Sequence, residues 1–201
     1  MKFKKHIFIF ILLIMSSCAT DKLIFQDKQF NDFENLNLKA VYQLERQSKD
    51  ISPAYLMEIG EDIYPNKSNY VLATPKIYKT QELPNFNRET DYYYTVNDSL
   101  VKVILYQWEY LQDNKYETLD SEEYKTKKFK VFQTKFDNLV EQLTQEFGAE
   151  ILKSIQQEKD SNDSFRDDYK FRSPDGLNAY LFMFGNNKSG YRQIRLAIYK
   201  D

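Results

Sequence analysis

The chain has 201 residues, with 28 lysines and arginines against 30 aspartates and glutamates, so its formal net charge is −2. A mildly acidic chain has no bulk attraction for nucleic acid, so no nucleic-acid partner is expected. The single cysteine excludes an internal disulfide, and the length fits one domain with a substantial core.

The first eighteen residues have the pattern of an export signal. Lysines at positions 2, 4 and 5 precede nine apolar residues, Ile7 to Met15, which are too few for a bilayer core that needs about 20. A positive start, a short apolar run and small residues at a cleavage site are typical of a secretory signal peptide. Here the small residues are Ser16 and Ser17, and Cys18 follows.

The stretch from Met15 to Cys18 resembles the lipobox of bacterial lipoproteins. The resemblance implies that residues 1–17 are a signal peptide, that the Cys18 thiol receives a diacylglyceryl group, and that the new amino group is acylated, for example with palmitate. Two or three acyl chains anchor a protein stably to a membrane. An ordinary secreted protein cut near Ser17 and an uncleaved membrane anchor are the alternatives.

The residue after the cysteine bears on localisation. Ala19 stands where an aspartate, in many Gram-negative bacteria, retains a lipoprotein in the inner membrane. The resemblance therefore implies a lipid-anchored protein of the cell envelope, at the outer membrane, and leaves the leaflet open.

Removal of the leader changes the available chemistry. Without its three lysines the chain keeps 25 basic residues against 30 acidic ones, a net charge of −5. The leader also contains the only histidine, His6, and lipidation would use the only thiol. No Ser-His-Asp or Cys-His arrangement and no zinc, iron or copper site with His or Cys ligands can then form. The sequence predicts no metal site and no cofactor, nominates no catalytic residue, and favours a protein that is not an enzyme.

Residues 18–35 are polar with scattered apolar side chains and predict a lipidated N-terminus and tether, followed by one α+β domain over residues 36–201. Leu36 to Leu44 alternates apolar and polar residues, which favours a strand, although a helical stripe fits the same segment. Ser52-Pro53 before an apolar run and Gly60 after it predict a short helix over residues 54–59.

Three prolines between residues 64 and 87 are expected to confine strands there to edges of the sheet or to brief segments. Tyr92–Val96 and Leu100–Tyr110, separated by three turn-forming residues, predict a hairpin. The second of these strands has apolar groups on both faces, which predicts a central position in the sheet.

Ser121–Phe147 is the clearest predicted helix, with Gly148 after its end and apolar residues at helical spacing. Ile151–Asp168 predicts a helical continuation that becomes a polar loop. Strands over residues 169–172, 177–184 and 191–199, joined by turns, predict a β-meander. The predicted fold class is α+β: an antiparallel sheet with one long amphipathic helix packed on a face.

Arg172, Arg192 and Tyr191 on the predicted meander are the candidate ligand-binding residues. If the two arginines share a face, they could hold an anionic or glycan ligand. The alternative is that they are exposed arginines paired with acidic residues on the sheet.

Three adjacent carboxylate pairs raise the possibility of a glycosidase: Glu122/Glu123, Glu61/Asp62 and Asp167/Asp168. Adjacent residues on a strand point to opposite faces, so adjacency does not nominate a catalytic pair. Residues 160–164 resemble the start of an EF-hand loop, but phenylalanines occupy the positions that need glycine and glutamate, so no such site is predicted.

The sequence therefore favours a lipid-anchored cell-envelope lipoprotein that is a non-catalytic binding or assembly module for an envelope protein or glycan. Its membrane contact would be the acyl chains on Cys18. The alternatives are a hydrolase of envelope glycans that uses Asp/Glu pairs, and a structural or stress lipoprotein without a dedicated ligand.

Overall fold

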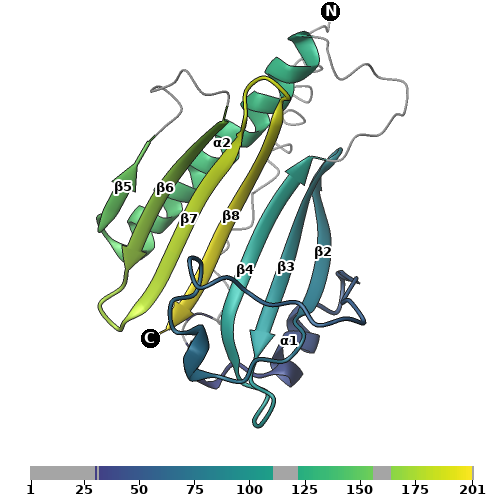
Figure 1. The fold of residues 1–201 in the computed structure, drawn as a ribbon, viewed down its shortest axis with the longest axis vertical. Helices are drawn as coiled ribbons and strands as arrows, with labels where there is room; N and C mark the ends of the chain where they lie inside the picture. The colour runs from purple at the N-terminus through teal and green to yellow at the C-terminus, as the bar shows by residue number, and fades with distance from the viewer. Residues whose placement is uncertain (1–29, 31, 111–121, 156–163, 201) are drawn as a thin grey trace, which may run out of the picture.

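The computed structural model describes residue 30 and residues 32–110, 122–155 and 164–200, with only the backbone of residues 122–126. These residues form an eight-stranded sheet with the order β1-β2-β3-β4-β8-β7-β6-β5, antiparallel throughout, and two α-helices (Figure 1). The elements are η2 (Phe33–Asn35), α1 (Leu38–Leu44), β1 (Lys49–Asp50), η3 (Lys67–Asn69), β2 (Lys76–Leu83), β3 (Phe86–Tyr94), β4 (Val101–Tyr110), α2 (Glu122–Phe147), β5 (Leu152–Ser154), β6 (Ser164–Arg172), β7 (Leu177–Asn186) and β8 (Tyr191–Lys200).

The two halves of the sheet, β1–β4 and β5–β8, meet where β4 pairs with β8. This pairing runs from Val103 opposite Tyr199 to Trp108 opposite Ile194. In the chain α2 lies between β4 and β5, so it connects the middle of the sheet to its far edge. Figure 1 shows α2 lying along β6, β7 and β8, and α2 contacts all three of these strands.

The larger core lies on the face of the sheet toward α2, which we call the inner face. The Phe132 ring meets Phe86 edge-on at 5.3 Å, and the Phe136 ring meets Tyr169 at 5.8 Å. Five α2 side chains spaced three or four residues apart are buried here: Phe132, Phe136, Leu139, Leu143 and Phe147. Burial of such a stripe is what makes a helix of this composition stable in water.

A second apolar cluster lies on the opposite, outer face. The segment from residue 51 to residue 73 crosses this face (Figure 1) and buries Ile59, Ile63 and Tyr64 against the sheet. The Tyr64 ring meets Tyr199 edge-on at 5.4 Å. Strand β4 contributes alternate residues to the two clusters, so its predicted central position is confirmed.

The structure agrees with the predicted α+β class and antiparallel sheet, with the sheet as the dominant part. The helix over Ser121–Phe147 is confirmed from Glu122 onward, and the β3–β4 hairpin and the β6–β7–β8 meander are confirmed. Strands β6 and β7 are longer than predicted. Phe30 and Phe33, which the sequence placed in the tether, are buried in the inner core.

The strand favoured for Leu36–Leu44 is wrong, because this segment contains helix α1. The Asn37 side chain accepts a hydrogen bond from the Ala40 backbone N–H at 3.2 Å and caps the helix. The helical pattern then buries Leu36 and Val41 and leaves Tyr42 exposed, which a strand alternation does not allow.

The short helix predicted over residues 54–59 is also wrong. The Ser52 hydroxyl accepts a hydrogen bond from the Ile77 N–H at 3.0 Å, and the Ile51 N–H donates to the Ile77 carbonyl at 2.9 Å. The residue expected to cap a helix therefore holds an irregular segment against β2. Tyr55 and Leu56 remain largely exposed.

Two further expectations about where strands and helices are interrupted or end were wrong. Pro84 lies in the turn between two long strands, β2 and β3, rather than interrupting one, and Asn85 completes that turn with φ +64°. After α2 the chain does not continue as a helix. Gly148 ends it with φ +88°, and β5 then pairs with β6.

Among the residues that the structure describes, no helix combines the length and the apolar character that a membrane crossing requires. The predicted leader, the Cys18 anchor and the residues immediately after them lie outside the described residues, so the anchor stays a prediction.

Truncation of Leu143 tests the contribution of α2 to the inner core. Leu143 is fully buried, so Leu143→Ala should lower the free energy of unfolding by about 2–5 kcal/mol through lost burial and a residual cavity. The measurement is a urea titration followed by circular dichroism. The control is Glu146→Ala, an exposed position one turn away, which should change stability by less than about 0.5 kcal/mol.

Candidate functional site

The three predicted ligand-binding residues are not brought together. Arg172 pairs with Asn178 at one end of the meander, whereas Arg192 pairs with Gly185 at the other end. Along β6 these levels are seven residues apart, which is about 23 Å at the rise of a strand. Arg192 also belongs to the inner face and Arg172 to the outer face, so the condition for a shared arginine site is not met.

Arg192 is a packing residue. Its side chain is buried, with the guanidinium carbon 4.0 Å from the Phe129 ring centre and 4.4 Å from that of Phe165. One guanidinium nitrogen donates to the Asn187 side-chain oxygen at 2.8 Å. Burial lowers the pKa of this guanidinium. Alternation with Ile194 on β8 assigns Arg192 to the inner face, which the sequence analysis did not use.

The outer face carries a polar row beyond the cover of residues 51–73. Strand register places one residue from each of six strands on the same level across the sheet. In order from β2 to β6 they are Lys79, Glu89, Gln107, Arg195, Phe182 and Asp168. We call this row and its neighbours Glu109, Arg166, Phe184, Tyr191 and Gln193 the outer strip.

Ion pairs fix both ends of the outer strip. Lys79 Nζ lies 2.9 Å from Glu89 Oε1 and 2.7 Å from Glu109 Oε1. At the other end Arg166 Nε lies 2.9 Å from Asp168 Oδ1. These side chains are partly exposed, so each ion pair contributes little to stability, but together they hold the row in one conformation.

Aromatic rings lie beneath the arginines of the strip. The Arg166 guanidinium carbon is 4.3 Å from the centre of the Phe182 ring, and that of Arg195 is 5.3 Å from the centre of the Phe184 ring. Tyr191, which is 49% exposed, meets Phe184 edge-on at 6.0 Å. The strip therefore ends in an accessible tyrosine beside arginines that their aromatic contacts orient.

Asp91 lies under the edge of this strip, one level closer to the apolar cluster. It is fully buried on β3, and its Oδ2 accepts a hydrogen bond from Gln107 Nε2 at 2.9 Å. Its Oδ1 has no hydrogen-bond partner among the described residues. Burial and, to a smaller extent, the nearby Glu89 raise the pKa of Asp91 to about 7, although Arg195 and Gln107 oppose the rise.

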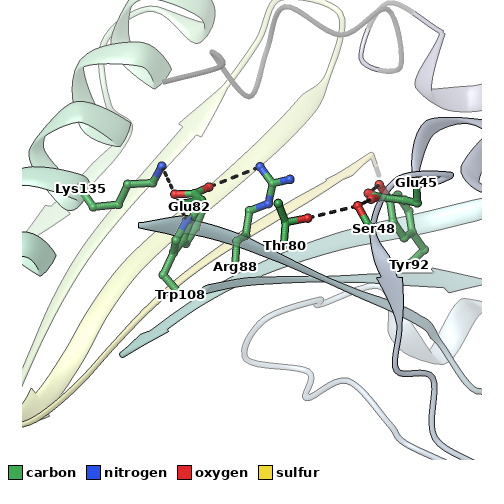
Figure 2. A network of polar contacts seen from close by, with 8 residues as sticks. All are labelled: Glu45, Ser48, Thr80, Glu82, Arg88, Tyr92, Trp108 and Lys135. Atoms are coloured by element: carbon green, nitrogen blue, oxygen red, sulfur yellow. Dashed lines mark hydrogen bonds and ion pairs between the residues drawn. The ribbon is translucent and has the colours of Figure 1, made fainter. Parts of the chain in front are cut away.

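A different polar network lies on the inner face (Figure 2). Glu82 Oε2 lies 2.7 Å from Lys135 Nζ of α2 and accepts a hydrogen bond from Trp108 Nε1 at 3.1 Å, while Glu82 Oε1 lies 3.5 Å from an Arg88 nitrogen. Glu82 thus connects the end of β2 to α2 and to the two neighbouring strands.

The second half of this network connects β2 and β3 to the segment that follows α1. The Tyr92 hydroxyl donates to Glu45 Oε1 at 2.6 Å, and the Ser48 hydroxyl donates to Glu45 Oε2 at 2.6 Å. Ser48 also lies 3.1 Å from the Thr80 hydroxyl. All of these contacts except the one between Ser48 and Glu45 join two segments, so we interpret the network as structural (Figure 2).

The adjacent carboxylate pairs do not meet in one cleft in the part of the chain that the structure describes. Asp167 is buried on the inner face, whereas Asp168 belongs to the outer strip. Glu61 and Asp62 are exposed in a turn, and the side chains of Glu122 and Glu123 lie outside the description. Residues 160–163 of the rejected EF-hand also lie outside it. Within the described ranges no group of three His, Cys, Asp or Glu residues is placed to hold a metal ion.

The outer strip has no net charge. Its three cations, Lys79, Arg166 and Arg195, balance three anions, Glu89, Glu109 and Asp168. A balanced strip has no attraction for a polyanion, but it offers hydrogen-bond donors and acceptors in fixed positions. Arginine and tyrosine on such a surface are enriched at the centres of protein interfaces.

Comparison of the chain with family models, curated proteins and solved structures gave no match. No family is therefore assigned, and the functional argument depends on the geometry described above. That geometry gives two regions to consider, the outer strip and the surroundings of Glu82.

Sequence reasoning missed most of the outer strip. One signal was present, because Val103 and Leu105 on one face of β4 are followed by the polar residues Gln107 and Glu109 on that same face. That change from apolar to polar residues predicts where the segment that covers this face of the sheet ends. The row itself could not be found, because it depends on the register of six strands.

The buried Asp91 carboxyl predicts a pH-dependent stability. Because its pKa is about 7 in the folded chain and near 3.8 when unfolded, the folded state binds more protons between these values. The free energy of unfolding should therefore fall by up to roughly 4 kcal/mol as pH rises from 4 to 7, and then level off. Asp91→Asn should remove this fall, measured by urea titrations from pH 4 to pH 8.

Asp98 provides a control, because its contribution to stability changes with pH in the opposite direction. Its carboxylate accepts hydrogen bonds from the Thr95 hydroxyl and the Leu100 N–H, which hold its pKa below the usual value. Its stabilisation is present above pH 4 and lost as pH falls, so Asp98→Asn should show a deficit that shrinks in acid. A wild-type chain whose stability rises between pH 4 and pH 7 relative to Asp91→Asn would contradict the assignment.

Proposed function

We propose that this chain is a lipid-anchored lipoprotein of the cell envelope, at the outer membrane, and a non-catalytic module that binds an envelope partner through its outer strip. In this proposal the acyl chains on Cys18 supply the membrane contact, and the folded part is a sheet with α2 packed on its inner face. The export signal supports the location, and the outer strip supports the binding.

The observation that carries the binding proposal is the row of residues across six strands. On the outer face, residues 51–73 bury the apolar levels of the sheet, and the next level consists of ordered polar side chains. Forming this row requires matched register across β2, β3, β4, β8, β7 and β6. A surface that only needed to be soluble would not require arginines placed over aromatic rings or a lysine shared by two glutamates.

We favour a protein over a glycan as the partner. The strip extends across six strands and its charges cancel, and surfaces with ordered arginine and tyrosine are typical of protein interfaces. A glycan is the second candidate, because Tyr191 and Phe184 are partly accessible rings beside amide and guanidinium groups.

The two alternatives have less support from the structure. A glycan hydrolase would need two accessible acidic groups in one cleft, whereas Asp91 is fully buried and Glu89 is held by Lys79. A structural lipoprotein without a ligand needs no specific surface, and the outer strip has no explanation in that case.

Replacement of Cys18 tests the anchor. Cys18→Ala should abolish incorporation of labelled palmitate and release the protein from the membrane fraction, because the thiol that accepts the lipid is gone. The measurement is metabolic labelling followed by detergent phase partition. Ser17→Ala keeps a small residue before the cysteine and should leave labelling intact. Continued palmitate labelling of Cys18→Ala would contradict lipidation at this residue.

Site-specific photocrosslinking tests the outer strip. A photoreactive phenylalanine derivative at position 191 should give a discrete crosslinked adduct in intact cells, identified by mass spectrometry, because Tyr191 lies at the accessible end of the strip. Tyr42 on α1 is the matched control, since it is also a tyrosine and also 49% exposed. The same probe at position 42 should give no such adduct.

A second variant connects the adduct to the strip. Arg195→Ala removes a guanidinium next to Phe184 without touching the crosslinker and should reduce the yield of the position-191 adduct several-fold. Equal adducts from positions 191 and 42, or a yield that Arg195→Ala does not change, would count against the strip as the binding surface.

A further inference from the structure

A groove on the inner side of the molecule separates α2 from the end of the β2–β3 hairpin. Its volume is about 260 Å³. Glu82, Leu83 and Phe86 line it from the hairpin. The helix lines it with residues at three- and four-residue spacing, which form one stripe: Lys127, Lys130, Val131, Thr134, Lys135 and Asn138. The groove does not include any residue of the outer strip.

The lining is basic. Three lysines face one glutamate, and that glutamate is already paired with Lys135 and Arg88. Lys127 and Lys130 are exposed at the rim and have no acidic residue in the lining left to neutralise them. An anion is the ligand that this charge arrangement favours.

The helix dipole does not explain these lysines. It favours acidic residues in the first turn and basic residues in the last turn, and its effect is small elsewhere in a helix. Helix α2 begins with Glu122 and Glu123, whereas Lys127, Lys130 and Lys135 lie in its interior turns and no basic residue lies in its last turn. The positions of the lysines instead coincide with the groove.

The floor of the groove is apolar. Phe86 is buried against the Phe132 ring, Val131 is partly buried, and Leu83 is 47% exposed at the hairpin end. Leu83 extends the apolar floor to the exposed edge of the groove. A volume of about 260 Å³ lies slightly below the roughly 300–1,000 Å³ of sites for drug-sized molecules, so it has room for one short chain rather than two.

We propose that this groove binds a single-chain anionic amphiphile, a fatty-acid carboxylate, with its chain along Leu83, Phe86 and Val131 and its head group at Lys127 and Lys130. Lys135 stays with Glu82, and this ion pair holds the hairpin end to α2 beside the groove (Figure 2). The two rim lysines are exposed, and Thr134 and Asn138 supply hydrogen-bonding groups nearby.

The chain contains its own reporter for this site. Trp108 is the only tryptophan, its Nε1 donates to Glu82, and Lys135 Nζ lies 5.1 Å from its ring centre. A carboxylate in the groove alters the field around Lys135 and Glu82, so it should change Trp108 emission. Figure 2 shows Trp108, Glu82 and Lys135 together at this end of the network.

The test is a titration of the processed, lipidated protein in phosphatidylcholine liposomes with decanoate, followed by Trp108 fluorescence. Acetate carries the charge without the chain, and decanol carries the chain without the charge. We expect a saturable change with decanoate and none with the other two. The double variant Lys127→Gln/Lys130→Gln should raise the apparent Kd by about tenfold or more, whereas Lys39→Gln, an exposed lysine on α1, should not change it.

Equal responses to decanol or acetate would overturn the proposal, as would a decanoate Kd that the double variant leaves unchanged. Retention of labelled decanoate by the proteoliposomes, compared with protein-free liposomes, is the second measurement, and equal retention would overturn it without reference to fluorescence. If phosphatidylglycerol in the bilayer reproduces the Trp108 change and blocks decanoate, the groove binds bilayer lipid and the proposal is wrong. None of these outcomes depends on the outer strip, so failure here leaves the proposed partner binding standing.

Discussion

The structure depends on the pairing of β4 with β8, because this single ladder joins two halves of the sheet that are far apart in the chain. Residues of β4 and β8 alternate between the two apolar clusters, so Ile104 and Ile198 pack on the inner face while Val103 and Tyr199 pack on the outer face. The ladder therefore sets the register of both cores together. A slip of one residue would exchange the two faces and place polar residues in both cores. Helix α2 follows from this arrangement, since it lies in the chain between β4 and the edge strand β5 and brings its apolar stripe to the inner face.

The same register explains the contrast between the two faces. On the inner face apolar residues continue to the far end of the meander, and even Arg192 is enclosed by aromatic rings there. On the outer face the cover supplied by residues 51–73 stops, and the next level is the polar row of the outer strip. Asp91 lies at this border, which is why it is both fully buried and adjacent to charged groups. Its raised pKa is therefore a consequence of where the cover ends and needs no catalytic explanation.

The sequence correctly predicted the elements for which several local features agreed. The α2 stripe, its terminal glycine and the turns of the meander each agreed with the burial that the structure shows. Predictions were wrong where a polar side chain had two possible uses: Asn37 caps α1, and Ser52 accepts from Ile77 in β2 instead of capping a helix. The candidate arginines were chosen by composition and chain proximity, but Arg172 and Arg192 differ in both face and level. A face follows from alternation along one strand, so Arg192 could have been assigned to the core. The level of a residue, meaning its position along the strands relative to the other strands, depends on how several strands pair. A single sequence does not give that pairing.

The outer strip and the groove differ in what orders their charges, and this difference separates their proposed roles. In the strip every cation has a described contact with an anion, an amide or an aromatic ring, so the surface is rigid before a partner arrives. Preorganised charges of this kind favour specificity for one complementary surface over raw affinity. In the groove only Lys135 is fixed, by Glu82, while Lys127 and Lys130 remain at an exposed rim. The outer strip therefore presents paired charges, whereas the groove presents exposed cations that have no acidic partner in its lining. The two regions lie on opposite faces, so a partner on the outer strip leaves the groove accessible.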